Sequence, residues 1–151
     1  GLRKGEALGL GWSSIDLDSS PATLTVRRAL KLVDRYTLYL DEPKTSGSRR
    51  TIHLPASTVT ALRAHRKDQA ERRLLCGPAW QDLDLVCDRG DGGPINPDSL
   101  SHAFAEIADR ADLGDVRLHD LRHLHATQLL AAGVRCGPSA AASATPTLQR
   151  R

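Results

Sequence analysis

The chain has 151 residues, of which 40% are hydrophobic and 26% are charged, and its formal net charge is +3. This balance predicts one ordinary globular domain rather than a disordered chain, and the mild positive charge favours polyanionic partners without singling out nucleic acid. Three cysteines without Cys-x-x-Cys spacing argue against a disulfide framework and against a zinc knuckle.

The chain shows no targeting or membrane signal. It starts GLRKGE rather than with Met, and it contains no apolar run of about 18 residues, the length that a membrane span requires. We therefore expect a cytoplasmic protein, truncated at its start, that has no membrane association.

Hydrophobic periodicity predicts a helix, three strands and then three helices. Residues 2–10 have helical spacing, and the turn cluster DLDSSP follows them. Apolar and polar residues then alternate in ATLTVRRAL, RYTLYLDE and RRTIHLP, which predicts three short antiparallel strands. The predicted fold class is α+β, mainly helical, with a small three-stranded antiparallel sheet.

The three later helices have clear start and stop signals. Pro55 opens a helix that ends at Cys76-Gly77, and Asn96 or Asp98 is expected to cap a helix through SLSHAFAEIADRADL. The last helix is predicted over residues 118–132. The first of these helices has a charged face that we interpret as solvated, with a DNA-facing role as the alternative. That face comprises Arg63, Arg66, Lys67, Arg72 and Arg73.

Several basic side chains are candidate anion ligands. On a helical wheel His119, Arg122 and His123 fall within about 100° of one another, while another arc is apolar and holds Leu118, Leu121, Leu129 and Ala132. The planar fork of an arginine suits two phosphate oxygens, and a helix start adds unpaired N–H groups. Arg3 and Lys44 are two further candidates. Their alternatives are an ordinary charged residue in the first helical turn and an ordinary turn lysine.

Three segments of the chain carry a specific pattern in a fixed order: GLRKGEALGLGWSSIDLD, PKTSGSRRTIHLP and LHDLRHLHATQLLAAGV. Together they resemble the catalytic domain of tyrosine recombinases, the phage integrase family. The resemblance covers residues 1 to about 134 and implies an integrase-like fold. It also implies double-stranded DNA as the partner, nucleoid association when bound to DNA, oligomeric action of complete family members on DNA, and neither a metal nor a cofactor.

The resemblance further implies roles for individual residues. Arg3 and Arg122 would clamp the scissile phosphate and stabilise its pentacoordinate transition state. Lys44 would donate a proton to the departing 5′ oxygen, and His119 would assist proton transfer and contact the phosphate. Glu6 would support the helix behind Arg3. Two further imidazoles would pack or brace without a catalytic role: His123 and His125.

The resemblance stops near Val134. The family continues with Leu-Gly-His, a Thr pair and later the tyrosine nucleophile, whereas this chain ends in a tail of small residues. Tyr36 and Tyr39 precede Lys44, which is the wrong order, and we interpret them as cross-strand aromatic packing. We therefore expect residues 1–134 to form a partial catalytic domain, 135–151 to be a non-native or disordered tail, and the chain to be inactive.

Two alternatives belong to other classes. A metal hydrolase would use His119-Asp120-x-x-His123, which resembles His-Glu-x-x-His, but the carboxylate is one methylene short and no third ligand is evident. A non-catalytic DNA-binding or interaction domain would use the arginines of the helix after Pro55 for phosphate neutralisation alone.

We predict that a frameshift at or just after Val134 replaced the native C-terminus. Codons for Cys136–Arg151 can be chosen so that, with G as the last base of the Arg135 codon, reading one base earlier gives V-R-T-V-S-G-R-L-G-H-A-D-A-S-T-T. This frame supplies the Leu-Gly-His and the Thr pair at the family's spacing. The nucleotide sequence past codon 134, read in all three frames, should contain this segment, and its absence from every frame would contradict the frameshift.

Overall fold

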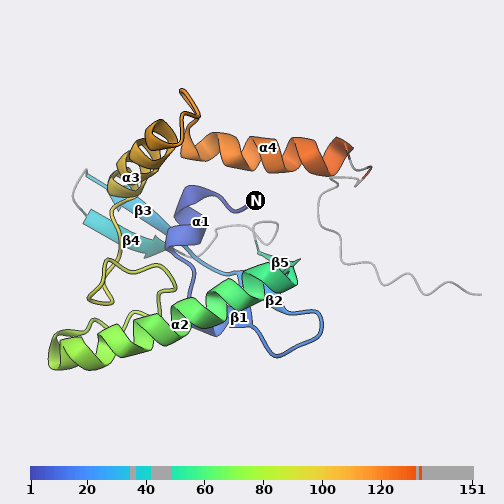
Figure 1. Ribbon diagram of the computed structural model, residues 1–151. Coiled ribbons are helices and arrows are strands. Elements are labelled where there is room, and N and C mark those ends of the chain that lie inside the picture. Colours follow the sequence, from blue (N-terminus) through green and yellow to red (C-terminus); the bar gives the residue numbers. More distant parts are fainter. Residues whose placement is uncertain (35–36, 42–48, 132, 134–151) are drawn as a thin grey trace, which may run out of the picture.

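The computed structural model of the chain describes residues 1–34, 37–41, 49–131 and 133, in which helices and two small sheets alternate (Figure 1). In chain order the elements are α1 Lys4–Leu8, η1 Trp12–Ser14, β1 Ile15–Asp16, β2 Thr23–Val26, β3 Ala29–Val33, β4 Thr37–Asp41, β5 Arg50–His53, α2 Ala56–Cys76, η3 Gly77–Ala79, α3 Pro97–Arg110 and α4 Leu118–Ala131. This α+β, mainly helical class agrees with the prediction from periodicity.

The predicted three-stranded antiparallel sheet is present, but one of its strands differs from the prediction. Its order is β1-β2-β5, and β4 pairs instead with β3 in a separate two-stranded sheet. The difference arises because the first predicted strand ends at Val26, and a further strand, β3, begins at Ala29 and runs through residues predicted as a connection. In β3 the buried Leu30 is followed by the exposed Lys31, and Leu30 lies opposite Leu40 of β4.

The hydrophobic core lies between the three-stranded sheet and α2. Leu10, Leu24, Val26 and Val86 form its buried centre, and side chains of the sheet, such as Ile52, pack around them. Leu10 follows α1, Leu24 and Val26 lie in β2, and Val86 lies in the loop after α2. The core therefore joins the first and middle thirds of the chain. Burial of such side chains is the main favourable term in folding.

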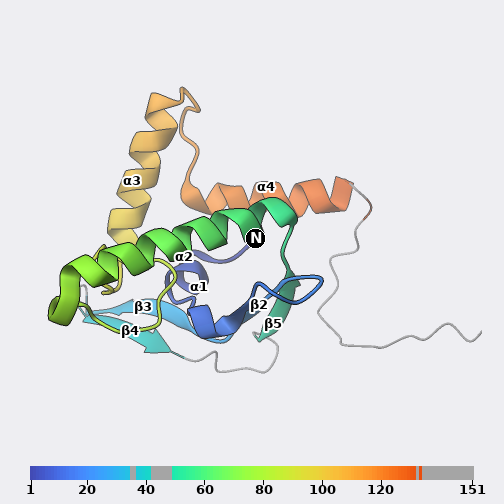
Figure 2. The ribbon, with the colours of Figure 1, turned by 60° about the horizontal axis from the view of Figure 1, so that its bottom comes forward.

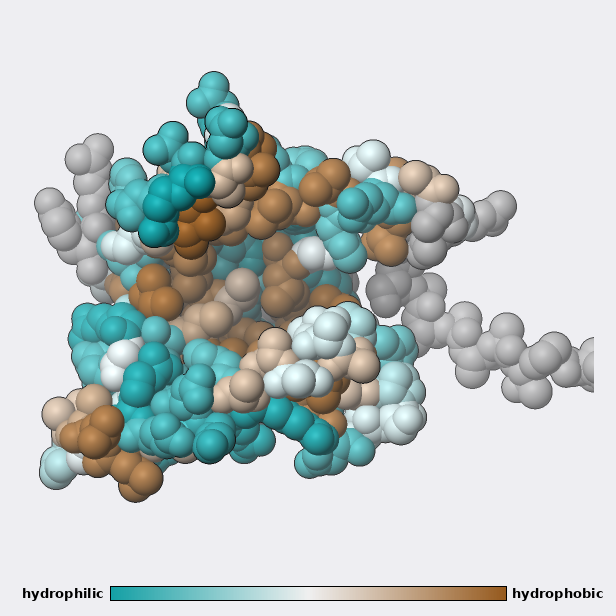
Figure 3. All heavy atoms as spheres, in the orientation of Figure 1, coloured by the Kyte–Doolittle hydropathy of each residue, from teal (hydrophilic) through white to brown (hydrophobic). Residues whose placement is uncertain are grey.

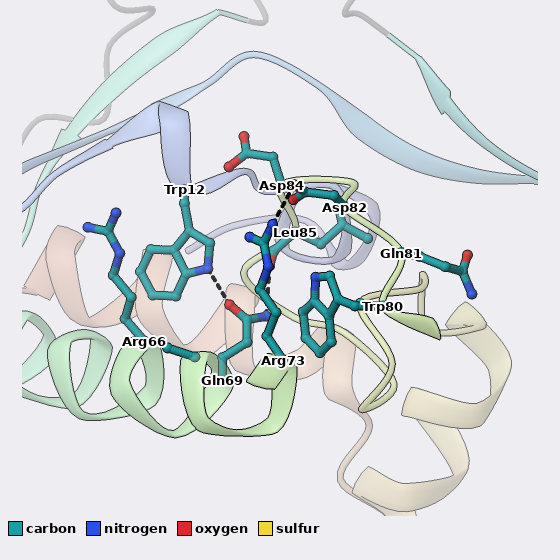
Figure 4. Close-up of a pocket in the computed structure, with 11 residues that line it drawn as sticks. Trp12, Arg66, Gln69, Arg73, Trp80, Gln81, Asp82, Asp84 and Leu85 are labelled. Carbon is teal, nitrogen blue, oxygen red and sulfur yellow. Dashed lines mark hydrogen bonds and ion pairs between the residues drawn. The ribbon is translucent and has the colours of Figure 1, made fainter. Parts of the chain in front are cut away.

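The buried Gln69 attaches α2 to this core through polar contacts. Its side-chain oxygen accepts a hydrogen bond from Trp12 Nε1 (2.6 Å), and its Nε2 donates to the Leu85 carbonyl (2.9 Å) and to Asp88 Oδ1 (2.7 Å). Figure 4 shows the Trp12 indole and the Gln69 amide pointing toward one another across the pocket beside α2. As predicted, the helix ends at Cys76, followed by Gly77 with a positive φ of 53°.

Two shorter helices complete the fold on the side of α1 away from the core. Asn96 caps α3 by accepting a hydrogen bond from the Asp98 amide (2.8 Å), one of the two caps predicted. In both ribbon views α4 extends away from α3, and the N-terminus lies close to α4 (Figures 1 and 2). Among the described residues, no helix is long and apolar enough to span a membrane.

The apolar arc predicted for the last helix is only partly packed. No described residue of α4 is buried: within the arc Leu118 and Leu129 are half-buried and Leu121 is 44% exposed, and outside it Leu124 and Leu130 are 55% and 60% exposed. Figure 3 shows apolar residues gathered between α4 above and α2 below. The described part of the chain therefore covers the apolar arc of α4 incompletely.

Candidate functional site

The two ends of the described chain meet at one pocket. Arg3, His119 and Arg122, three of the four residues predicted to act together, all line a hollow of about 230 Å³. Its walls come from the N-terminal segment, α1, α3 and α4. The remaining lining residues are Gly1, Leu2, Lys4, Ala7, Leu100, Leu118 and Leu121. The fourth predicted residue, Lys44, lies outside the described residues, so its placement stays a prediction.

Glycines let α1 sit directly on the backbone of β3. A Cβ atom on Gly5 would lie 2.6 Å from the Leu30 carbonyl oxygen, and one on Gly9 would lie 2.6 Å from the Leu30 nitrogen. Because real Cβ atoms do not approach other atoms so closely, larger residues would push the helix away. The glycines of GLRKGEALGLGW thus set the position of Arg3 at the start of α1.

Glu6 holds Arg3 in place through two hydrogen bonds. As the third residue of α1, it accepts a hydrogen bond from the Arg3 backbone amide (2.7 Å), which closes the first turn. Its Oε1 also accepts from the Arg3 guanidinium Nη1 (3.0 Å). The Arg3 side chain remains 62% exposed, so the rest of its planar fork is available to an anion.

A second arginine binds the same carboxylate. Arg50 Nη1 donates to Glu6 Oε1 (3.0 Å) and Arg50 Nη2 donates to Oε2 (2.6 Å), a two-pronged contact with a nearly buried group. Burial by itself would raise the pKa of Glu6. The hydrogen bonds from Arg50 and from the amide and guanidinium of Arg3 outweigh it and lower the pKa from 4.5 to about 2.

The sequence interpretation assigned no role to Arg50, although the strand pattern contains a signal for it. In RRTIHLP, Arg50 alternates in phase with Ile52, the residue that packs against the core. An arginine on the inward face of a strand requires a carboxylate partner, because an unpaired buried charge is costly. The pattern therefore indicates that Arg50 forms a buried ion pair, but it does not identify the carboxylate.

The second arginine of the pocket is held by the chain's first residue. Arg122 is half-buried, and its Nη1 donates a hydrogen bond to the Gly1 carbonyl oxygen. The start of α4 has the same capping contact as α1. Asp120, the third residue of α4, accepts a hydrogen bond from the Arg117 amide (2.8 Å). Both arginine-bearing helices therefore begin with a carboxylate that fixes the first turn.

His119 is exposed at the pocket, and its ring meets the His123 ring edge to face with 4.6 Å between the centroids. In the described residues, no group of three His, Cys, Asp or Glu side chains is placed to hold a metal ion. The metal-hydrolase hypothesis therefore gains no support from this part of the chain. His125 is likewise exposed, and its bracing role stays a prediction.

The basic face of α2 is engaged in contacts within the chain. Arg63 contacts Asp18 (2.9 Å), Arg72 contacts Asp88 (3.2 Å) and Arg73 contacts Asp82 (2.7 Å). Arg66 stacks over the Trp12 ring at 5.3 Å. Figure 4 shows Arg66 and Arg73 on either side of Gln69, where they line a second pocket of about 210 Å³. These arginines attach α2 to the loops around it.

The comparisons with known proteins identify the family. A profile described as the phage integrase family matches residues 1–136. The chain belongs to this family. It is 33% identical over 145 residues to a tyrosine recombinase XerC-like protein of Caldanaerobacter subterraneus subsp. tengcongensis, which covers 89% of this chain and 37% of that protein. It is 35% identical over 91 residues to an integrase of Saccharopolyspora erythraea, covering 60% and 21% respectively.

The same fold occurs in solved structures. The Tn1549 transposon integrase in complex with circular intermediate DNA has a TM-score of 0.72 and 20% identity, covering 89% of this chain and 44% of that one. Its complex with transposon right end DNA gives a TM-score of 0.71 at 20% identity, with the same coverage. The integrase-like fold expected from the residues is thereby confirmed. The chain spans less than half the length of each protein compared.

The depressed pKa of Glu6 predicts how the fold responds to acid. A carboxyl group whose pKa is lowered by folding contributes stability above its ordinary pKa of 4.5, and this contribution is lost as the pH falls toward about 2. We expect Glu6→Gln to lower the free energy of unfolding by roughly 2–3 kcal/mol at pH 7, and by progressively less below pH 4.5. Urea unfolding at a series of pH values measures this.

The matched control is Glu71→Gln, which removes an exposed carboxylate that lies 3.9 Å from Lys67. An exposed pair of this kind contributes little, so its unfolding free energy should stay within about 0.5 kcal/mol of the wild-type value. A Glu6→Gln variant that loses the same amount of stability at pH 2 as at pH 7 would contradict the assigned ion-pair network.

Proposed function

We propose that this chain is the phosphate-binding part of a site-specific DNA recombinase, with a partial catalytic domain over residues 1–134. In complete form such a protein would break and rejoin DNA strands through a phosphotyrosine intermediate. The observation that carries the proposal is that Arg3, His119 and Arg122, from opposite ends of the described chain, line one pocket. The Tn1549 integrase structures are complexes with DNA, which supports a DNA partner for this chain.

The pocket suits a backbone phosphate by charge and by donor geometry. Arg3 and Arg122 each use one guanidinium nitrogen to bind the protein, which leaves further donors for non-bridging phosphate oxygens. Fixed cations around a phosphate stabilise the charge that builds up on its oxygens as a fifth ligand enters. His119 lies where it can contact the same group and exchange a proton with it.

The fourth member of the proposed site is Lys44, as proton donor to the leaving 5′ oxygen. In the sequence it lies between β4 and β5. A lysine between two strands can approach the phosphate as DNA binds, and its proton is needed on the oxygen that departs. We propose this role together with those of the two arginines and His119, and without any metal or cofactor.

The alternative, non-catalytic DNA binding by the α2 face, is disfavoured by a specific observation. Arg63, Arg72 and Arg73 already contact carboxylates, and Arg66 stacks on an indole. Binding DNA through these side chains would require those contacts to be exchanged for phosphate contacts. The pocket arginines lie together with His119 around one hollow, which makes them the better ligands for a single phosphate.

We predict that Arg3→Ala and Arg122→Ala each weaken binding to a short duplex DNA about tenfold at fixed salt. Each should also reduce the slope of log Kd against log salt by about one, because one phosphate contact is lost. Fluorescence anisotropy with a labelled duplex, at several salt concentrations, measures both quantities.

The control is Arg73→Ala, which removes the same charge from an exposed position on α2. It should change the affinity by less than about threefold, since its guanidinium is bound to Asp82. A larger loss for Arg73→Ala than for Arg3→Ala and Arg122→Ala would favour binding through α2 and reject the proposed phosphate site.

We further predict that the 151-residue chain forms no covalent adduct with DNA. Its only tyrosines are Tyr36 and Tyr39. Tyr36 lies outside the described residues. Tyr39 lies on β4 opposite Lys31 of β3, 56% exposed, and is not among the residues that line the phosphate pocket. Tyr39 thus faces a lysine across the strands rather than an aromatic ring.

Incubation with a suicide DNA substrate carrying the cognate site, followed by denaturing electrophoresis, tests this prediction. The 151-residue chain should show no shifted band, whereas a chain restored to the frame proposed above and extended to a family tyrosine should show one. An adduct of the 151-residue chain that disappears in Tyr36→Phe or Tyr39→Phe would overturn the assignment.

A further inference from the structure

Arg50 reaches the phosphate pocket only through Glu6. It is the first residue of β5, it does not line the pocket, and its side chain is 22% exposed. Both ends of its guanidinium fork are bound to the two oxygens of Glu6, at 3.0 and 2.6 Å. The same carboxylate holds the Arg3 amide and guanidinium, so one buried group joins β5 to the residue proposed to bind DNA.

Two arginines compete for this carboxylate. Only one guanidinium fork can approach a carboxylate end-on, with one N–H bound to each oxygen, because that approach uses the facing lone pairs of both oxygens. Arg50 makes that contact, and the Arg3 guanidinium makes a single bond to Oε1. The Arg3 fork is therefore kept from turning fully onto Glu6, and most of its donors remain exposed.

We propose that Arg50 is a positioning residue for DNA binding: by occupying both oxygens of Glu6, it keeps the Arg3 guanidinium turned outward toward the phosphate. This inference rests on the function proposed above. If Arg50 lost its fork, Arg3 could form the two-pronged contact itself, because the buried charge of Glu6 attracts the nearest free cation. Arg3 would then bind Glu6 in place of the anion, although Arg3 itself is not substituted.

Arg50→Lys tests this without changing the net charge of the chain. A lysine ammonium is a point charge and cannot span both carboxylate oxygens as a planar fork does. We expect Arg50→Lys to weaken binding of a fluorescein-labelled duplex roughly fivefold at fixed salt. In an Arg3→Ala background the same substitution should have no further effect, because the side chain that it acts through is gone.

The control is Arg28→Lys, at an arginine of similar exposure (26%) that serves the fold elsewhere. Arg28 donates to the carbonyl oxygens of Gly9, Leu83 and Asp84. Its replacement should lower the melting temperature and leave the DNA affinity within about twofold of wild type, since a general loss of packing does not act through Arg3. Circular dichroism establishes that each variant is folded.

The outcomes separate the two proposals. If Arg3→Ala weakens binding but Arg50→Lys binds as wild type, or if the two losses simply add, the positioning role is rejected and the phosphate site stands. If Arg3→Ala and Arg122→Ala bind as wild type, the proposed function itself fails. Should Arg50→Lys not fold, Arg50→Gln serves in its place, with Arg28→Gln as its charge-matched control: the loss of binding beyond that of the control should appear only while Arg3 is present, and an equal loss in the Arg3→Ala background would overturn the inference.

Discussion

The buried carboxylate of Glu6 constrains the arrangement around α1. A charge removed from water is tolerated only when opposite charges and hydrogen-bond donors surround it, and Glu6 receives them from two parts of the chain. Arg3 comes from its own helix, and Arg50 comes from the start of β5. A helix of five residues has little stability by itself, so these contacts and the packing of Gly5 on β3 hold α1 in place.

The second half of the proposed phosphate pocket rests on fewer contacts. Arg122 is tied to the Gly1 carbonyl, and the described residues of α4 include none that is buried. Elements with little buried apolar surface open at lower free energy than a packed core. The site thus combines an arginine fixed by a buried ion pair with an arginine on a thinly packed helix. A phosphate bound between Arg3 and Arg122 would add a contact that joins the two ends of the chain.

Local signals in the sequence predicted much of this structure. Pro55, Gly77 and Asn96 marked helix ends, because the fixed φ of proline, the freedom of glycine and a capping side chain act within one turn. The segments around Arg3 and Arg122 identified the family. Contacts between distant residues were not predictable in the same way. Alternation identified strands but not their partners, so β4 was assigned to the wrong sheet, and nothing local paired Arg50 with Glu6.

The central claim is that Arg3 and Arg122 bind the same phosphate. The most direct test is an NMR titration of arginine Nε–H signals with a short DNA duplex, with the two signals assigned from the single alanine variants. The account predicts that the Arg3 and Arg122 signals shift together with one Kd and that the His119 ring signals follow them, while the Arg66 and Arg73 signals stay within noise. Shifts confined to the α2 arginines, or different Kd values for Arg3 and Arg122, would contradict it.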